Sequence, residues 1–270
     1  MAGSFAGQRI VVVGASAGIG REFARRALAD GAEVIVTGRR QQRLDELVAE
    51  VGRGIPQAVD ITDPASCAAL ADTVRAEFGS LDLLFCSAGY SPLRYFDEVT
   101  PDDWRRILEI NVIGIHQLIR TVLPVSAPGA LIAVMSSESV AQPRQALGAY
   151  TASKAALELS MRVWRQEHPE LRYTTIIVGG TFPTDFGSEF DMDRLARAMG
   201  DWARHGVVQE RLMDTEQVAA ALAGTLASFV DLPDVNLDTV VVRSPSAVVG
   251  SSEQLEATAA ENLSLIGDRT

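Results

Sequence analysis

The segment IVVVGASAGIG (residues 10–20) decides the fold class of this chain. Four β-branched apolar residues run into a turn with glycines at positions 14, 18 and 20, and a helix-length segment follows. This order predicts a buried strand, a tight turn and a helix N-terminus, where close backbone approach and free N–H groups suit a pyrophosphate. The alternative is a merely tight turn without a ligand, because a glycine pattern alone is weak and this spacing is not the commonest dinucleotide pattern.

The composition limits the class of protein. Of 270 residues, 47% are hydrophobic, which is enough for a sizeable core, and the net charge of −11 argues against a nucleic-acid or anionic-membrane partner. No apolar stretch approaches the roughly 18 residues of a membrane span, and the first residues lack a signal-peptide pattern. Cys67 and Cys86 lie in apolar stretches and are expected to be reduced core residues. A cytoplasmic location follows by default, and no metal site is expected because His116, His168 and His205 form no ligand spacing.

Short apolar runs alternate with helix-length segments along the chain. The expected strands are 9–13, 33–37, 55–59, 81–85, 130–135, 173–178 and 238–242, and the clearest expected helices are 19–31, 64–79, 100–123 and 215–229. The strands are apolar almost throughout, as in strands buried on both faces. The pattern predicts an α/β fold with a single, doubly wound parallel sheet of about seven strands and helices on both faces.

No linker-like stretch divides the chain, so we expect one domain over residues 1–245. It includes an irregular insertion at about 180–213. Residues 246–270 form a tail of uncertain structure. Leu255, Ala259 and Leu263 recur there at four-residue steps, which suits a short docked helix, but a disordered segment is the alternative.

Lys154, in AYTASKAALEL (149–159), is the only lysine in a chain with 23 arginines. Tyr150 lies four residues earlier, so a helix would place both side chains on one face. Ser137 follows an expected strand, at the edge where open α/β sheets bind ligands. Each residue alone is more often structural, and the lone lysine is then an accident of drift. Together they suggest a site that needs a compact ammonium rather than a forked guanidinium.

A series of short motifs between residues 9 and 184 resembles the short-chain dehydrogenase/reductase family, in the family's own order. The glycine turn matches its Thr-Gly-x-x-x-Gly-x-Gly pattern, except that Val13 replaces threonine. The further matches are Asp60 in AVDIT, Ala88 and Gly89 in CSAG, Asn111 in INVIG, Ser137, Tyr150, Lys154, and Gly180 and Thr184 in GGTFPT. Such joint matches are far more specific than any single motif.

The chain also departs from the family pattern at a few positions. Cys86 and Ser87 replace two asparagines that in the family mainly support the strand and its neighbours. Gly179 replaces a proline, and Glu138, directly after the family's serine, is unusual. The sequence suggests no role for Glu138.

The resemblance implies a Rossmann-like fold and an oxidoreductase that transfers a hydride between NADP(H) and a carbonyl or secondary alcohol. It implies that Tyr150 is the general acid/base, and that Ser137 binds the reacting oxygen. Lys154 would lower the pKa of Tyr150 and bind the nicotinamide ribose, and Asn111 would hold a water of the proton relay. The alternatives are a non-catalytic dinucleotide-binding regulator, or a cofactor-assisted isomerase or lyase on the same fold.

The resemblance also implies the cofactor-binding positions. They are Gly14, Ser16, Ala17, Gly18, Ile19, Gly20, Arg39, Asp60, Ile61, Ala88, Gly89, Tyr150, Lys154, Gly180 and Thr184. Gly38 stands where NAD-preferring members carry an acidic residue, so the repulsion of a 2′-phosphate is missing. Arg39 is expected to grip that phosphate, whereas Arg40 is expected to begin the next helix and face solvent. NADP(H) is therefore expected to be preferred over NAD(H), although Ala17 lacks the basic side chain that many NADP-preferring members carry.

The insertion at about 180–213 corresponds to the family's substrate lid. It contains the apolar residues Phe182, Phe186, Phe190, Met192, Met199, Trp202 and Leu212. They favour a partly hydrophobic carbonyl or alcohol substrate, although a lid that packs only on itself is the alternative. The family's interfaces imply a homotetramer or homodimer built from residues 104–123 and 150–167 and from the last helix and strand.

Overall fold

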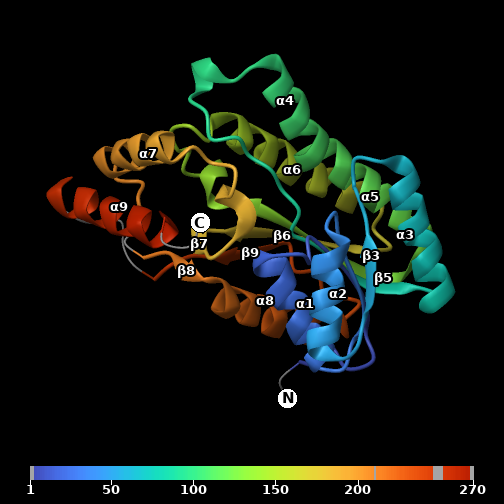
Figure 1. The fold of residues 1–270 in the computed structure, drawn as a ribbon. Helices are drawn as coiled ribbons and strands as arrows, with labels where there is room; N and C mark the ends of the chain where they lie inside the picture. The colour runs from blue at the N-terminus through green and yellow to red at the C-terminus, as the bar shows by residue number, and fades with distance from the viewer. Residues whose placement is uncertain (1–2, 210, 246–251, 268–270) are drawn as a thin grey trace.

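The central sheet of this computed structural model has seven parallel strands in the order β3-β2-β1-β4-β5-β6-β9 (Figure 1). The structure describes residues 3–209, 211–245 and 252–267. The strands are β1 (Arg9–Val13), β2 (Glu33–Gly38), β3 (Ile55–Ala58), β4 (Leu81–Cys86), β5 (Ser126–Ser137), β6 (Arg172–Val178) and β9 (Thr239–Val242). The predicted fold class is confirmed. The strand order reverses between β1 and β4, so a ligand crevice is expected at their carboxyl ends.

Helices cover both faces of the sheet. One face packs against α1 (Gly18–Ala29), α2 (Gln41–Val51) and α8 (Thr215–Val230), and the other against α3 (Pro64–Glu77), α5 (Ile115–Val122) and α6 (Gly148–Glu167). Successive side chains of a strand point to opposite faces. Ile10 and Val12 accordingly lie in one core cluster, whereas Val11 and Val13 lie in the other. This explains why the strands are apolar almost throughout.

The segment predicted as one helix over 100–123 is broken into three parts. The helix α4 (Pro101–Leu108) begins with a capping box between Thr100 and Asp103. A π-helical turn over Glu109–Gly114 follows, and α5 continues from it. Wide turns of this kind are frequent at functional sites, and this one contains Asn111.

The prediction of an irregular insertion at 180–213 is wrong. The segment contains β7 (Thr181–Phe182), which pairs with β8 (Met213–Asp214), and the 13-residue helix α7 (Met192–Arg204). The side chain of Asp191 accepts a hydrogen bond from the backbone N–H of Arg194 and caps α7. The buried face of α7 forms a third, smaller apolar core.

The tail contains a helix, α9 (Ser252–Gly267), which packs against α7 (Figure 1). Ala259 is buried in the third core and Leu263 packs against it, as the four-residue spacing suggested. Leu255 belongs to α9, but its side chain lies outside the described residues, as do residues 246–251 and 268–270. Within the described ranges, no helix has both the length and the apolar character that crossing a membrane requires.

Candidate functional site

The glycine turn lies tightly against the end of β4. The backbone φ is +90° at Gly14 and +56° at Gly18, values that favour glycine. A Cβ atom on Gly14 would lie 2.5 Å from the hydroxyl oxygen of Ser87, and one on Gly20 would lie 2.4 Å from the carbonyl oxygen of Gly14. Ala17, which precedes α1, provides no side-chain cap. The turn therefore combines a glycine-lined backbone with an uncapped helix N-terminus, which fits a pyrophosphate group.

Ser87 connects the end of β4 to the end of β1 by hydrogen bonds. Its backbone N–H and its hydroxyl both donate to the carbonyl oxygen of Val13, at 2.9 and 3.0 Å. The end of β4 is thereby held to the last residue of β1. Cys86 beside it is fully buried, and burial raises the pKa of its thiol. Of these two departures from the family pattern, Ser87 joins the strand ends, and Cys86 is a buried core residue.

Asp60 and Arg39 lie beyond the carboxyl ends of β3 and β2. The carboxylate of Asp60 accepts hydrogen bonds from the backbone N–H and the hydroxyl of Thr62, at 2.9 and 2.7 Å. These bonds lower the pKa of Asp60, and the nearby charge of Arg39 lowers it further. Arg39 itself is exposed. Ile61, next to Asp60, packs close to the π-helical turn, because a Cβ atom on Gly114 would lie 3.0 Å from it.

Arg40 precedes α2, as predicted, but its side chain does not simply face solvent. Its guanidinium donates to the hydroxyl of Ser16 in the glycine turn at 2.8 Å. It also forms an ion pair of 2.5 Å with Asp185 at the start of the lid, and Arg43 contacts the same carboxylate at 3.4 Å. Arg40 therefore connects three segments that are distant in the sequence. Residue spacing gave no sign of the Asp185 contact.

Ser137, Tyr150 and Lys154 come together at the carboxyl end of β5 and the first turns of α6. The hydroxyl of Ser137 lies close enough to the phenol of Tyr150 to act on its pKa. Lys154 is only 2% exposed, and its ammonium donates to the carbonyl oxygen of Met135 at 2.9 Å. The same nitrogen lies 5.8 Å from the centroid of the Tyr150 ring. The three predicted side chains thus form one polar cluster, in which Tyr150 and Lys154 are buried and Ser137 is half-buried.

Burial dominates the protonation of this cluster. It raises the pKa of Tyr150 to about 12, although the neighbouring Ser137 acts in the opposite direction. It lowers the pKa of Lys154 from its usual 10.5 to about 8. The expectation that Lys154 lowers the pKa of Tyr150 is therefore not met in this structure. The physical reason is that the loss of hydration outweighs the favourable neighbours of the phenolate.

Asn111 joins the π-helical turn to the end of β4 and to α6. Its carbonyl oxygen accepts from the backbone N–H of Tyr90 at 2.8 Å. Its amide donates to the carbonyl oxygen of Tyr90 at 2.8 Å and to the hydroxyl of Ser153 at 2.9 Å. A Cβ atom on Gly89 would lie 3.4 Å from the ammonium of Lys154 and 3.8 Å from the Asn111 carbonyl oxygen. Asn111 therefore borders the same space as Lys154.

The first part of the lid covers this cluster. The ring of Phe186 lies 5.0 Å from that of Tyr150, and Phe190 packs edge-on against Phe186 at 5.5 Å. Thr184 lies against the glycine turn, since a Cβ atom on Gly18 would be 3.4 Å from it. The lid thus touches both the predicted cofactor turn and the predicted catalytic tyrosine.

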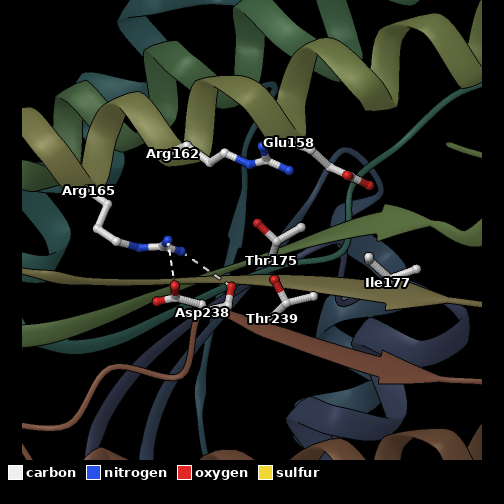
Figure 2. Close-up of a pocket in the computed structure, with 7 residues that line it drawn as sticks. All are labelled: Glu158, Arg162, Arg165, Thr175, Ile177, Asp238 and Thr239. Atoms are coloured by element: carbon white, nitrogen blue, oxygen red, sulfur yellow. Dashed lines mark hydrogen bonds and ion pairs between the residues drawn. The ribbon is translucent and has the colours of Figure 1, made fainter. Parts of the chain in front are cut away.

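A cavity of about 500 Å³ lies elsewhere, between α6 and the strands β6 and β9 (Figure 2). Its lining residues are Glu158, Arg162, Arg165, Thr175, Ile177, Asp238 and Thr239. Arg165 spans part of it through an ion pair of 3.1 Å with Asp238. None of the residues predicted for catalysis or cofactor binding lines this cavity, so it is separate from the candidate site.

Comparisons with known proteins agree with this geometry. The family model for short chain dehydrogenases matches residues 8–197. A short-chain type dehydrogenase/reductase of Picea abies is 32% identical over 232 residues, which cover 80% of this chain and 84% of the relative. The 2-dehydro-3-deoxy-L-rhamnonate dehydrogenase (NAD(+)) of a Sphingomonas species is 29% identical, over 81% of this chain and 88% of its own.

A solved structure supports the fold. The alcohol dehydrogenase of the archaeon Thermococcus sibiricus, complexed with 5-hydroxy-NADP, superposes with a TM-score of 0.74 at 22% identity. The match covers 88% of this chain and 97% of that one. Because the family model spans well over half of the sequence, the chain belongs to the short-chain dehydrogenase/reductase family of oxidoreductases.

Proposed function

We propose that this protein transfers a hydride between NADP(H) and a carbonyl or secondary alcohol, with Tyr150 as the general acid/base. The observation that carries the proposal is the cluster of buried Tyr150 and Lys154 with half-buried Ser137, which adjoins Gly89 at the edge of the sheet that also bears the glycine turn. A non-catalytic regulator would not need a buried proton donor in this place.

The protonation of the cluster suits proton donation to a carbonyl oxygen. When bound, the nicotinamide supplies the hydride. Ser137 binds the substrate oxygen and holds it beside the phenol of Tyr150. With its pKa raised to about 12, Tyr150 is protonated at neutral pH and can donate its proton to that oxygen. Lys154 is proposed to bind the nicotinamide ribose, and Asn111 holds the backbone of Tyr90 and α6 in place beside it.

The cofactor preference is proposed from the end of β2. Gly38 carries no carboxylate, and a Cβ atom there would meet the hydroxyl of Ser16 at 3.3 Å. Arg39 is exposed beside this position, and Arg40 already reaches Ser16. Because no carboxylate stands at the end of β2, the guanidinium of Arg39 suits a 2′-phosphate, whereas that of Arg40 is already paired with Asp185. The Thermococcus relative was solved with an NADP derivative, whereas the Sphingomonas relative is named for NAD(+).

The substrate is proposed to be at least partly hydrophobic, because Phe186 packs against Tyr150 from the lid and Phe190 packs against Phe186. A homodimer or homotetramer is proposed on the family's usual interfaces. Ile113, Leu159 and Val163 are exposed on the helices concerned, as a buried contact between copies would require.

The test is a panel of ketones and secondary alcohols, followed at the nicotinamide absorbance with each cofactor. Tyr150→Phe should lower the rate at least about 10²-fold, in line with general acid catalysis, and should leave the dissociation constant of NADPH nearly unchanged. Tyr173→Phe is the matched control, because Tyr173 is equally buried but lies in the core under α6. Near-normal turnover by Tyr150→Phe would refute the assigned role.

A further inference from the structure

Glu138 follows Ser137 directly and is 2% exposed, although it is a charged residue. Its carboxylate forms an ion pair with Arg144. It also accepts hydrogen bonds from the side-chain amide of Gln209, at 2.8 and 2.9 Å. A buried carboxylate is costly unless it is paired and fully hydrogen-bonded. Both partners, Arg144 and Gln209, lie outside β5. Gln209 belongs to the base of the lid, residues 202–209.

Arg144 extends the connection to the lid. Its Nε donates to the backbone carbonyl of Val207 at 3.1 Å, and its guanidinium lies 5.9 Å from the ring centroid of Trp202 at the end of α7. The indole N–H of Trp202 donates in turn to the carbonyl oxygen of Gln145 at 2.9 Å. The loop after Ser137 and the lid base are thus joined by a continuous polar network.

The C-terminal helix is attached to the same network. The amide of Asn262 on α9 donates to the backbone carbonyl of Gln209 at 3.1 Å, and Asn262 is 7% exposed. Since α9 also packs along α7, the lid base is held from two sides. One side is the strand that carries Ser137, and the other is the tail of the chain.

The backbone at the end of β6 is shaped to admit this network. A Cβ atom on Gly179 would lie 2.7 Å from a carboxylate oxygen of Glu138 and 2.6 Å from the amide nitrogen of Gln209. A Cβ atom on Gly180 would lie 2.6 Å from the amide oxygen of Gln209. The glycine at 179, in place of the family's proline, is therefore explained by the carboxylate that occupies the space of its side chain.

We infer that Glu138 is a positioning residue, which locks the base of the substrate lid onto the end of the strand that bears Ser137. Through Arg144 and Gln209, Glu138 fixes the position of the lid base relative to the hydroxyls of Ser137 and Tyr150. It touches none of the predicted catalytic groups other than by adjacency in the chain. Its kinetic consequence rests on the proposed function, whereas its effect on the lid does not.

The experiment compares Glu138→Gln with the double variant Glu138→Met/Arg144→Met. Glu138→Gln leaves a buried guanidinium unpaired and should lower the melting temperature, whereas the apolar pair should recover it. In both variants KM for the carbonyl substrate should rise about tenfold or more, because the lid base is no longer held in place. The dissociation constant of NADPH should stay unchanged. Glu189→Gln is the matched control, since Glu189 is an exposed lid carboxylate that pairs only distantly, at 3.7 Å, with Arg106.

Limited proteolysis provides a readout that does not depend on activity. The exposed Arg204 and Arg211 flank Gln209, and trypsin should cut there about tenfold faster in both Glu138 variants than in wild type. If the double variant recovers the melting temperature, KM and protection from trypsin together, Glu138 serves stability alone and the inference is wrong. It is also wrong if trypsin cuts all proteins equally. If wild type turns over no carbonyl substrate, but trypsin still cuts the Glu138 variants faster than wild type, only the proposed function is contradicted.

Discussion

Replacement of Lys154 by methionine should make the protein more stable while it removes a group that the proposed mechanism needs. Lys154 is 2% exposed, and burial lowers its pKa from 10.5 to about 8. Since one pKa unit corresponds to about 1.4 kcal/mol, the charged lysine destabilises the fold by about 3 kcal/mol at neutral pH. Methionine has a similar length and no charge, so it removes this penalty.

The gain is offset in part by a lost hydrogen bond. The ammonium donates to the Met135 carbonyl at 2.9 Å, and bonds from charged groups contribute about 1.5–3 kcal/mol. We therefore expect Lys154→Met to raise the free energy of unfolding by up to about 1.5 kcal/mol at pH 7. For a chain of this size that corresponds to an increase of up to roughly 5 °C in the melting temperature.

The pH dependence gives the sharper test. The folded pKa of Lys154 lies below the unfolded value, so between about pH 8 and 10.5 the unfolded chain binds more protons. The contribution of Lys154 to the free energy of unfolding of wild type must therefore rise with pH across that window. The advantage of Lys154→Met should be full below pH 8 and should shrink towards pH 10.5, because other titrating groups are common to both proteins.

Thermal melts of both proteins without cofactor, from pH 7 to 10.5, measure this difference directly. A variant that is less stable than wild type at pH 7 would refute the reasoning, and so would an advantage that does not change with pH. In either case the lysine would be better hydrated or better paired than its burial indicates. Loss of NADPH binding by the same variant is expected and is measured separately by titration.

Lys154→Arg keeps the charge but changes its shape, and we expect large losses of both turnover and NADPH affinity. If the variant has the kinetics of wild type, the site does not require a lysine at this position. Arg39→Ala should abolish the preference for NADPH over NADH in measured dissociation constants, and equal or tighter NADH binding by wild type would contradict the proposed preference. Arg40→Ala should weaken NADPH binding and remove the ion pair with Asp185 at the start of the lid. A protease should then cleave the lid faster than in wild type. Light scattering at micromolar concentration should give a dimer or tetramer, with contacts over 104–123 and 150–167, whereas a monomer would contradict that proposal.

Much of the fold follows from local features of the sequence. A continuous apolar run such as residues 10–13 can only be buried on both faces, and glycines at 14, 18 and 20 can only serve a tight turn between strand and helix. The spacing of Tyr150 and Lys154 likewise places them on one helix face without knowledge of any other element. These properties depend on neighbours within a few residues, so the sequence alone reveals them.

Only the tertiary structure decides the properties that depend on distant segments. The pKa of Tyr150 is set by how much water the lid and sheet exclude, and burial raises it where the sequence pattern predicted a decrease. The contact of Arg40 with Asp185 spans 145 positions, and that of Glu138 with Gln209 spans 71. Hydration and long-range pairing are properties of the packed chain, because each requires that segments far apart in sequence meet at one edge of the sheet.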